Sequence, residues 1–278
     1  MLSCGSSQTS PTTPAAETVA VLVGGGDIAD CSPGAAATAT LLDGISGTVF
    51  TAGDNAYPAG ATADFANCYG PTWGRHRSRT RPAPGNHDYL AAGAAPYYAY
   101  FGDNAGASGL GYYSFDLGAW HIISLNSNVT AATGSAQYQW LTADLLAHPA
   151  VCTAAIWHHP MFSSFLHGND LVMQDVWRLL YDKGADVVLN GHDHAYERFA
   201  PQDGIGRADA ARGIREFLVG MGGAPLYAQG TVRANSEVRN NTTFGVIKLT
   251  LRCATYDWEF VPAAGGSFRD SGSGACVR

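Results

Sequence analysis

Five short segments of the sequence contain the aspartate, asparagine and histidine residues that bind hard metal ions. These segments are Gly26-Asp27-Ile28, Gly53-Asp54-Asn55-Ala56-Tyr57, Gly85-Asn86-His87-Asp88, Trp157-His158-His159-Pro160 and Gly191-His192-Asp193-His194-Ala195-Tyr196-Glu197-Arg198. Two divalent or trivalent ions about 3.5–4 Å apart need oxygen and imidazole ligands and one bridging carboxylate. Each segment alone would fit a helix cap, a turn or a core histidine. Together the five segments predict a metal centre with two ions.

Regular elements must position these side chains, and apolar runs predict strands that lead into the five segments. We expect strands at Val19–Gly24, Thr48–Ala52, Tyr112–Leu117, Trp120–Leu125, Val151–Trp157, Ala185–Leu189, Ile214–Gly220, Thr243–Leu251 and Ala254–Val261, and helices at Pro33–Asp43, Ser135–His148 and Asn169–Lys183. The last two strands are predicted to form a hairpin, and Arg81–Pro84 leads into the third segment. Strands alternate with helices first and dominate later, which predicts mixed sheets flanked by helices. Because ligands in α/β folds sit outside the carboxyl ends of strands, the five segments should converge on one site.

In type and order, these motifs resemble those of the calcineurin-like metallophosphoesterases, and within them the purple acid phosphatase branch. The resemblance runs from about Val19 to Arg198. The wider family usually opens with D-x-H, but Ala29 stands two residues after Asp27, whereas Tyr57 occupies the position of the purple acid phosphatase tyrosinate. The resemblance implies an α/β fold of two mixed β-sheets packed as a sandwich and flanked by helices. It also implies a single catalytic domain over residues 18–278.

The resemblance further implies which residues bind each ion. The first ion would be bound by Asp27, Asp54, Tyr57 and His194, and the second by Asp54 as the bridge, Asn86, His158 and His192. A phenolate is a hard anionic donor that favours Fe(III), so we expect Fe(III) at the Tyr57 site and Zn, Fe or Mn at the second. A packed loop aromatic is the alternative interpretation of Tyr57.

The implied reaction is hydrolysis of a phosphate monoester by hydroxide that the two ions generate from water. By similarity His87 assists the leaving alkoxide and is oriented by Asp88, while His167 lies near the leaving group. A phosphodiesterase or phosphotriesterase on the same site is the nearest alternative, and an inactive metal-binding interaction protein is a third. A metallo-β-lactamase-type hydrolase is excluded, because its motif H-x-H-x-D-H needs aspartate two residues after the second histidine, and here Ala195 and Tyr196 follow His194.

Four further features could contribute to the site, and for some of them a structural role is the alternative. The basic run Arg75 to Arg81 could steer anionic substrates, but a solvated face is favoured. Glu197 and Arg198 could contact substrate, but a buried structural pair is favoured. His159 could support a ligand from outside or form a wall of the pocket. The glycine-rich turn at residues 220–223 could line the site.

Composition narrows the class of protein. The chain has 278 residues and a formal net charge of −7, which argues against a stable nucleic-acid partner. Hydrophobic residues make up 46% of it, enough for a large core. The longest aliphatic run, Val19 to Val23, is far shorter than a membrane-spanning helix, so we expect no transmembrane segment. A small phosphate ester is the expected partner, while its identity and the oligomeric state stay open.

The N-terminus and the cysteines suggest a location outside the cytoplasm. Residues 1–17 are rich in Ser, Thr and Pro and predict a flexible tether. Leu2-Ser3-Cys4-Gly5 resembles the end of a bacterial lipoprotein signal, so Cys4 is either a lipid-anchor site or a chance cysteine. We expect a disulfide between Cys31 and Cys68, which follow loops of the active face, and a second from Cys152 to Cys276 or Cys253.

Overall fold

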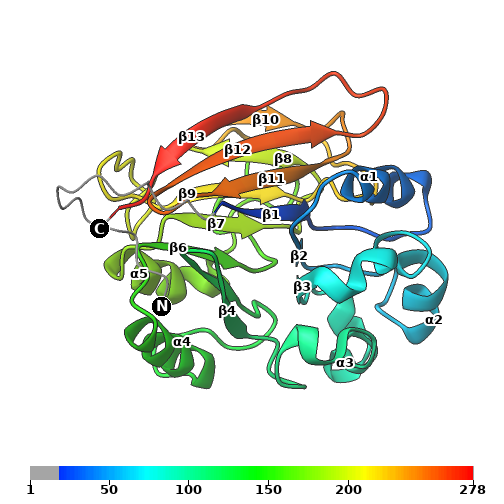
Figure 1. The fold of residues 1–278 in the computed structure, drawn as a ribbon, viewed down its shortest axis with the longest axis horizontal. Coiled ribbons are helices and arrows are strands. Elements are labelled where there is room, and N and C mark those ends of the chain that lie inside the picture. Colours follow the sequence, from blue (N-terminus) through cyan, green and yellow to red (C-terminus); the bar gives the residue numbers. More distant parts are fainter. Residues whose placement is uncertain (1–18, 278) are drawn as a thin grey trace, which may run out of the picture.

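The computed structural model describes residues 19–277, which form two β-sheets with helices on both sides (Figure 1). The six-stranded sheet has the order β13-β12-β11-β1-β2-β3, and the seven-stranded sheet has the order β10-β8-β9-β7-β6-β5-β4. The tether at residues 1–17 and Cys4 lie outside the described residues. Among residues 19–277, no helix combines the length and apolar character needed to cross a membrane.

The six-stranded sheet begins with three parallel strands and continues into antiparallel ones. Its strands are β1 (Ala20–Gly25), β2 (Thr48–Ala52), β3 (Thr80–Ala83), β11 (Gly245–Leu251), β12 (Thr255–Pro262) and β13 (Ser271–Ala275). β1, β2 and β3 run parallel, while β11 lies antiparallel to β1. β11 and β12 pair as the expected hairpin, with Gly245 opposite Pro262 and Leu251 opposite Tyr256.

The seven-stranded sheet has a parallel centre and antiparallel edges. Its strands are β4 (Tyr113–Leu117), β5 (Trp120–Ser124), β6 (Cys152–Ile156), β7 (Val187–Asn190), β8 (Tyr196–Phe199), β9 (Arg215–Val219) and β10 (Ser236–Asn240). β5, β6, β7 and β9 run parallel, whereas β4 lies antiparallel to β5, and β8 and β10 are antiparallel to their neighbours. Both sheets are therefore mixed, as the sequence predicted.

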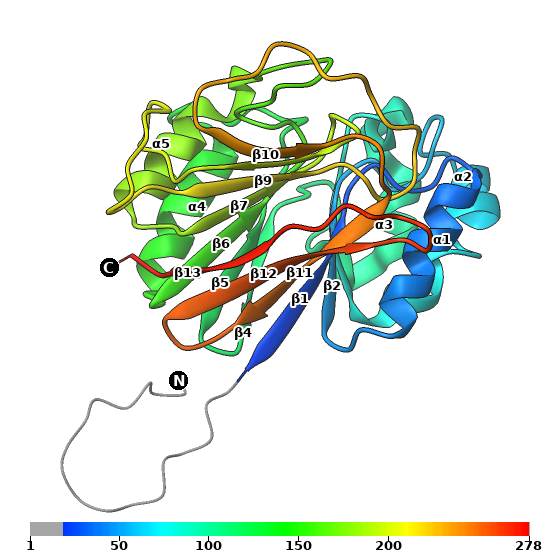
Figure 2. The same cartoon turned by 90° about the horizontal axis from the view of Figure 1, so that it is seen from above.

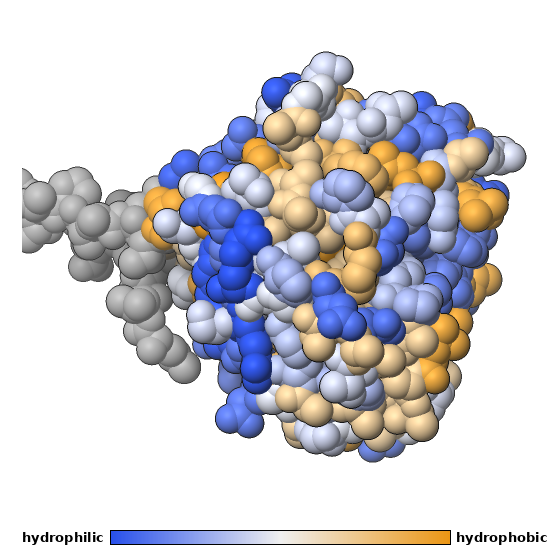
Figure 3. Space-filling view, turned by 90° about the vertical axis from the view of Figure 1, so that its right-hand side faces the viewer, coloured by the Kyte–Doolittle hydropathy of each residue, from blue (hydrophilic) through white to orange (hydrophobic). Residues whose placement is uncertain are grey.

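The helices cover the outer faces of the two sheets. They are α1 (Pro33–Asp43), α2 (Thr62–Asp64), α3 (Ala95–Phe101), α4 (Ala136–Ala147) and α5 (Gln174–Asp182), with short π or 3₁₀ turns at Phe65–Tyr69, Trp73–Arg79, Asp88–Leu90, Ala92–Ala94, Gly102–Ala105 and Leu171–Met173. Figure 2 shows α4 and α5 on the side of β6 and β7, with α1 and α2 on the opposite side. The face beside α1 to α3 mixes hydrophilic and apolar residues (Figure 3).

Three apolar clusters hold these layers together. One cluster lies between the sheets and includes Leu22, Phe50, Ile122, Ala154 and Leu189, all at most 1% exposed. The other two join each sheet to its helices: one groups Val23 and Val49 with residues of α1 and α3, and the other groups residues of β5 to β7 with those of α4 and α5. Each Å² of apolar surface removed from water stabilises the fold by about 25 cal/mol. This layered packing is therefore the main source of stability.

One expectation about local structure was wrong, and another holds only in part. The predicted helix at 169–183 is shorter, because Asp170 accepts a hydrogen bond from the Val172 N–H and a 3₁₀ turn precedes α5. The basic run at 75–81 is a solvated face only in part, because Arg75 and Arg77 are exposed but Arg79 is half-buried. Arg79 donates to the carbonyls of Leu42, Ile45 and Gly47 and so caps the C-terminal end of α1.

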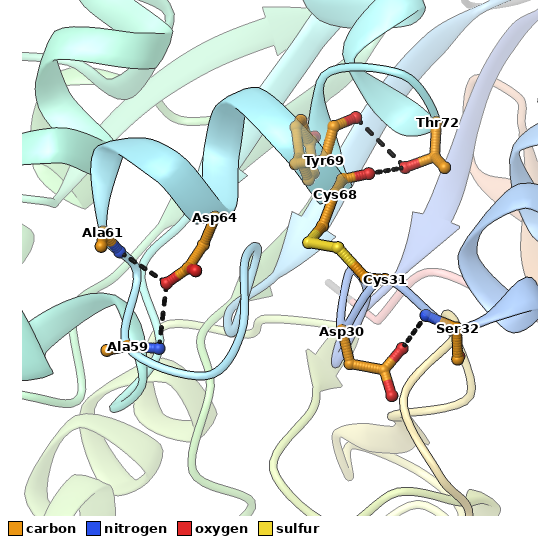
Figure 4. The surroundings of a disulfide bond; sticks show 9 residues. All are labelled: Asp30, Cys31, Ser32, Ala59, Ala61, Asp64, Cys68, Tyr69 and Thr72. Carbon is orange, nitrogen blue, oxygen red and sulfur yellow. Dashed lines mark hydrogen bonds between the residues drawn. A yellow bond between two sulfur atoms is a disulfide. The ribbon is translucent and has the colours of Figure 1, made fainter.

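Both disulfides agree with the sequence-based expectations. Cys31, in the loop after β1, is bonded to Cys68 in the π turn at Phe65–Tyr69 (Figure 4). Cys152 is bonded to Cys276, so Cys276 rather than Cys253 is its partner. The first disulfide joins the loop that carries Asp27 to the segment that follows Tyr57, so it restrains two of the five motifs relative to each other.

Candidate metal centre

The seven expected ligands all follow the carboxyl ends of strands and come together at one end of the two sheets. Asp27 lies after β1, Asp54 and Tyr57 after β2, Asn86 after β3, His158 after β6, and His192 and His194 after β7. Both sheets therefore contribute ligands. The convergence follows from parallel pairing, because parallel strands end at the same edge of a sheet.

The first group of ligands surrounds the Tyr57 hydroxyl. Its oxygen lies 3.0 Å from Asp27 Oδ1, 3.0 Å from Asp54 Oδ2 and 3.0 Å from His194 Nε2. His194 Nε2 is in turn 3.4 Å from Asp27 Oδ1. The four side chains expected at the first ion thus direct their donor atoms to a single point.

The second group surrounds the Asn86 side-chain oxygen. Asn86 Oδ1 lies 2.9 Å from His158 Nε2 and 3.0 Å from His192 Nδ1. His158 Nε2 lies 3.3 Å from Asp54 Oδ2, the same oxygen that faces Tyr57 in the first group. Asp54 therefore stands between the two groups, where a bridging carboxylate has to be.

The donor set around Tyr57 fits a cation better than it fits a proton. One phenol proton can satisfy only one of the surrounding acceptors, yet two carboxylates and an imidazole face it. Burial, reinforced by Asp27 and Asp54, raises the pKa of Tyr57 well above its ordinary value. A cation held at this point would supply the charge that lets the phenol ionise.

Backbone conformation at the ligands is also adapted to the site. Asp27, Asp54 and His192 have φ angles of 59°, 50° and 75°, a region that costs energy for residues other than glycine. Gly85 approaches so closely that a Cβ there would lie 2.1 Å from Asp54 Oδ1. Strained backbone conformations and close backbone contacts in these loops thus direct the carboxylates and imidazoles inward.

The buried imidazoles differ in their electrostatic surroundings. Burial opposes protonation of His158, but the neighbouring Asp54 carboxylate outweighs burial and raises its pKa to about 9. Burial, together with His158 and other histidines nearby, lowers the pKa of His192 to about 2. His192 is therefore neutral and offers the lone pair that a metal ligand needs.

His87 lies at the rim of the centre, but Asp88 does not orient it as the sequence predicted. His87 Nε2 is 4.0 Å from Asp54 Oδ2, and its side chain is 32% exposed. Its Nδ1 faces the carbonyl of Pro58 at 2.6 Å. Asp88 is buried beneath the loop, where its Oδ2 accepts hydrogen bonds from Gly85 and Asn55. Asp88 thus shapes the loop, and the Pro58 carbonyl orients the His87 ring.

His167 is also beside the centre, and a residue that sequence reasoning did not assign positions it. Asp193 Oδ1 accepts from the His167 N–H at 2.9 Å and lies 2.9 Å from His167 Nδ1, while Asp193 Oδ2 accepts from the Ser163 hydroxyl. The His167 ring stacks on the His192 ring with centroids 4.2 Å apart. In the sequence Asp193 lies between the expected ligands His192 and His194, and this position was the signal that could have marked it as a site residue.

Tyr227 is a second residue that the sequence did not reveal. Its ring stacks on His194 with centroids 3.9 Å apart, and its N–H donates to the His194 carbonyl. Pro225 in the same loop faces His194 Nδ1 with its carbonyl oxygen at 2.7 Å. This loop joins β9 to β10, and after its glycine-rich start it carries no recognisable motif, so only the tertiary structure places Tyr227 against the ligand.

The remaining candidates have structural contacts. His159 Nδ1 lies 2.8 Å from the Ser127 hydroxyl, and its ring lies 4.5 Å from that of His192, so it forms part of the wall. Glu197 accepts from Ser164 and Ser236, and Arg198 pairs with Asp270. Glu197 and Arg198 thus have structural contacts, but they bind these residues rather than each other. Gly220 lines the site, since a Cβ there would lie 2.7 Å from Asp27 Oδ2.

Comparison with known proteins identifies the family. The family model described as calcineurin-like phosphoesterase matches residues 14–196. Purple acid phosphatase 15 of Arabidopsis thaliana is 33% identical over 145 residues, which cover 45% of this chain and 27% of that protein. Human acid phosphatase type 7 is 30% identical over 146 residues, which cover 42% of this chain and 32% of that protein. The matches thus span about a quarter to a third of these relatives.

Solved structures show the same fold. Purple acid phosphatase PPD1 from yellow lupin seeds superposes with a TM-score of 0.77 at 20% identity, covering 94% of this chain and 54% of that one. GAP50, described as the anchor in the inner membrane complex of Plasmodium, superposes with a TM-score of 0.74 at 12% identity, covering 94% and 90%. With the motifs, the family match and the purple acid phosphatase relatives in agreement, this chain belongs to the calcineurin-like phosphoesterase family, in its purple acid phosphatase-like branch.

Proposed function

We propose that this protein is a dinuclear-metal phosphoesterase that hydrolyses phosphate monoesters. The observation that supports this most strongly is the position of Asp54 Oδ2, 3.0 Å from the Tyr57 hydroxyl and 3.3 Å from His158 Nε2. One carboxylate oxygen shared by two donor groups is the arrangement that a pair of adjacent ions requires. We propose that residues 18–278 form the catalytic domain.

The proposed ligands fall into the two groups already described. Fe(III) would be held by Asp27, Asp54, Tyr57 and His194, and Zn, Fe or Mn by Asp54, Asn86, His158 and His192. When bound, the ions supply positive charge that clamps the phosphoryl oxygens and lowers the pKa of water. The phenolate and the carboxylates set the charge and the hardness of the site, which favours Fe(III) at Tyr57.

His87 is suited to give a proton to the leaving oxygen. The Pro58 carbonyl can only accept a hydrogen bond, so His87 Nδ1 carries the proton that faces it. Nε2 then points toward the centre, and in the imidazolium form it donates its proton to the departing alkoxide. The partial exposure of this side chain leaves room for substrate beside it.

His167 stands on the other side of the centre and is proposed as a second group near the leaving oxygen. Asp193 fixes the Nδ1 edge of its ring, so Nε2 is the edge that remains available to substrate. The stack on His192 keeps the ring against the second group of ligands. Positioning of this kind lowers the entropy lost when the reacting groups meet.

The compartment is also part of the proposal. Two disulfides fit an oxidising environment, so we infer that the protein works outside the cytoplasm, either secreted, periplasmic or anchored at the cell surface through Cys4. Its partner would be a small phosphate ester.

The test compares 4-nitrophenyl phosphate with bis(4-nitrophenyl) phosphate, which share one leaving group, on metal-replete protein from acid to alkaline pH. We expect a higher kcat/KM for the monoester. The Asp54→Asn variant, which keeps the shape of the bridge but removes its charge, should lose activity on both. A preference for the diester would assign the protein to the phosphodiesterases. Equal rates for wild type and Asp54→Asn would show that the metal centre takes no part in the reaction.

A further inference from the structure

A second cluster of histidine and aspartate lies away from the proposed catalytic centre. Asp116 and His121 are direct cross-strand partners in the β4–β5 hairpin. Asp144 and His148 lie four residues apart at the C-terminal end of α4, where His148 is the capping residue. Both spacings bring side chains to one face, so two rigid elements each present a carboxylate and an imidazole.

The buried member of this cluster is held on both ring edges. His121 Nδ1 lies 3.0 Å from Asp116 Oδ1, and His121 Nε2 lies 2.8 Å from Asp144 Oδ2. Asp144 Oδ1 also accepts from the Ser114 hydroxyl at 2.7 Å. The side chains of His121 and Asp144 are only 1% and 8% exposed, so the geometry of this pair is fixed.

The two other members open to solvent. The side chains of Asp116 and His148 are 68% and 47% exposed and border a hollow of about 210 Å³ next to Trp120. One ligand atom each of Asp116, His121 and His148 lies within 4.8 Å of the others. An ion can therefore reach Asp116 and His148 from outside, and the buried His121 has a ligand atom within 4.8 Å of theirs.

A neutral imidazole leaves this arrangement one proton short. Neutral His121 has a single N–H, and Asp144, the buried carboxylate, is the partner that most needs it. Nδ1 then directs its lone pair at the Asp116 carboxylate, which also offers lone pairs. Either a second proton or a metal ion between the two removes this conflict. Burial opposes protonation of His121, but Asp144 and Asp116 outweigh burial and raise its pKa, so the proton and the ion compete for Nδ1.

We propose that Asp116, His121 Nδ1 and His148 form a binding site for Zn²⁺ or a similar divalent transition-metal ion. Asp144 holds His121 Nε2, the carboxylate–histidine–metal arrangement that fixes a ligand ring and makes it more basic. Three protein ligands leave the fourth tetrahedral position for water. The His148 ring now lies parallel to His121 at 4.8 Å, so it rotates toward the ion on binding, which its exposure permits.

This site is separate from the proposed catalytic centre. His121 pairs with Thr153 near the start of β6, whereas His158 follows the end of that strand. At about 3.3 Å per residue the two histidines are roughly 15–20 Å apart along the sheet. The ion would join β4, an edge strand, to the C-terminal end of α4, so its role is to hold the edge of the sheet.

The test counts Zn²⁺ per chain, by elemental analysis after dialysis, on chelator-treated full-length protein reloaded with Zn²⁺. The variants are Asp116→Asn and His148→Ala, with Asp182→Asn as a matched exposed carboxylate outside the cluster. Wild type and Asp182→Asn should bind one ion more than the two cluster variants. Zn²⁺ should raise the Tm of wild type by roughly 5 °C more than that of His148→Ala.

Activity separates this site from the proposed catalytic centre. His148→Ala should lose one ion and keep the wild-type rate of phosphate-ester hydrolysis, whereas loss of a catalytic ion would lower that rate. If the proposed function is wrong, the difference of one ion between wild type and His148→Ala persists without any activity. Equal ion counts and equal Tm shifts in all four proteins would overturn the inference and leave the cluster as an ion-pair network.

Discussion

The Tyr57 hydroxyl is the residue-scale feature that most constrains the chemistry. It faces two carboxylates and an imidazole, each at 3.0 Å, while burial and these carboxylates raise its pKa. A phenol in such surroundings ionises only when a strong Lewis acid takes the place of its proton.

The Tyr57→Phe variant should therefore lose a visible tyrosinate-to-Fe(III) absorption band that the wild type shows. Tyr227→Phe is the matched control, because it keeps the ring stacked on His194 and removes a phenol outside the donor set. Absorption spectra of aerobically purified proteins make the comparison. A colourless, fully active wild type that contains only zinc would contradict the iron assignment.

His167 and Asp193 form a unit whose parts cannot act independently. The buried Asp193 carboxylate bonds both the backbone and the ring of His167 and is itself held by Ser163. Replacing Asp193 by asparagine would remove the charge that holds the His167 ring, while the ring itself would stay intact. Asp193 is therefore a positioning residue.

His167→Ala should lower kcat by about 10²-fold, the smaller end of the range for a group that transfers protons. Asp193→Asn alone should lose part of that factor, but in the His167→Ala background it should change kcat little, because the ring it positions is absent. A double-mutant cycle in kcat measures this, with metal content as the control. Additive losses, or loss of metal in Asp193→Asn, would assign Asp193 to the ligands instead.

At the scale of elements, short strands end in loops that other segments hold in place. The loop after β6, which carries His167, is bound by Glu197 through the backbone and hydroxyl of Ser164. The loop after β1, which carries Asp27, is joined to the π turn by the Cys31–Cys68 disulfide (Figure 4). These attachments let strained ligand loops keep one conformation.

The double variant Cys31→Ser with Cys68→Ser should be less stable than the oxidised wild type by about 4 kcal/mol. This value comes from closing a loop of 37 residues in the unfolded chain. Urea unfolding of the variant and the wild type measures the loss, without a reducing agent, because reduction would also break the Cys152–Cys276 disulfide. Unchanged stability would show that the fold alone restrains these loops.

At the scale of the whole molecule, Asp186 joins the end of the chain to the seven-stranded sheet. Its Oδ2 accepts from the Thr153 N–H at the start of β6, and its Oδ1 accepts from the Val277 N–H beside the Cys152–Cys276 disulfide. Burial raises the pKa of Asp186 to about 7, against an ordinary value of 3.8. The folded state therefore holds this proton more tightly than the unfolded state does.

This raised pKa gives a pH dependence with a defined sign. The contribution of Asp186 to stability is fully present below about pH 4 and is lost as the pH rises to 7, a change on the order of 3–4 kcal/mol. Asp186→Asn should flatten the fall in stability between pH 4 and 8. Unfolding of both proteins across that range checks the prediction, and parallel curves would contradict it.

The sequence by itself determined the family, the two mixed sheets, most elements and the identity of the candidate ligands. It could do so because ligand residues follow strands directly, and parallel strands bring their ends together whatever the details of packing. Pro33–Asp43 and Thr48–Ala52 were predicted with their observed bounds, since a proline start and a β-branched run are local signals.

Tertiary structure decided the features that depend on contacts between distant segments. Pro58 rather than Asp88 orients His87, Asp193 positions His167, and Tyr227 reaches His194 from a loop more than thirty residues further along the chain. β8 and β10 escaped prediction because β8 was interpreted as part of a motif and β10 is polar. Local sequence encodes which side chains can do chemistry, but packing selects the neighbours that aim them.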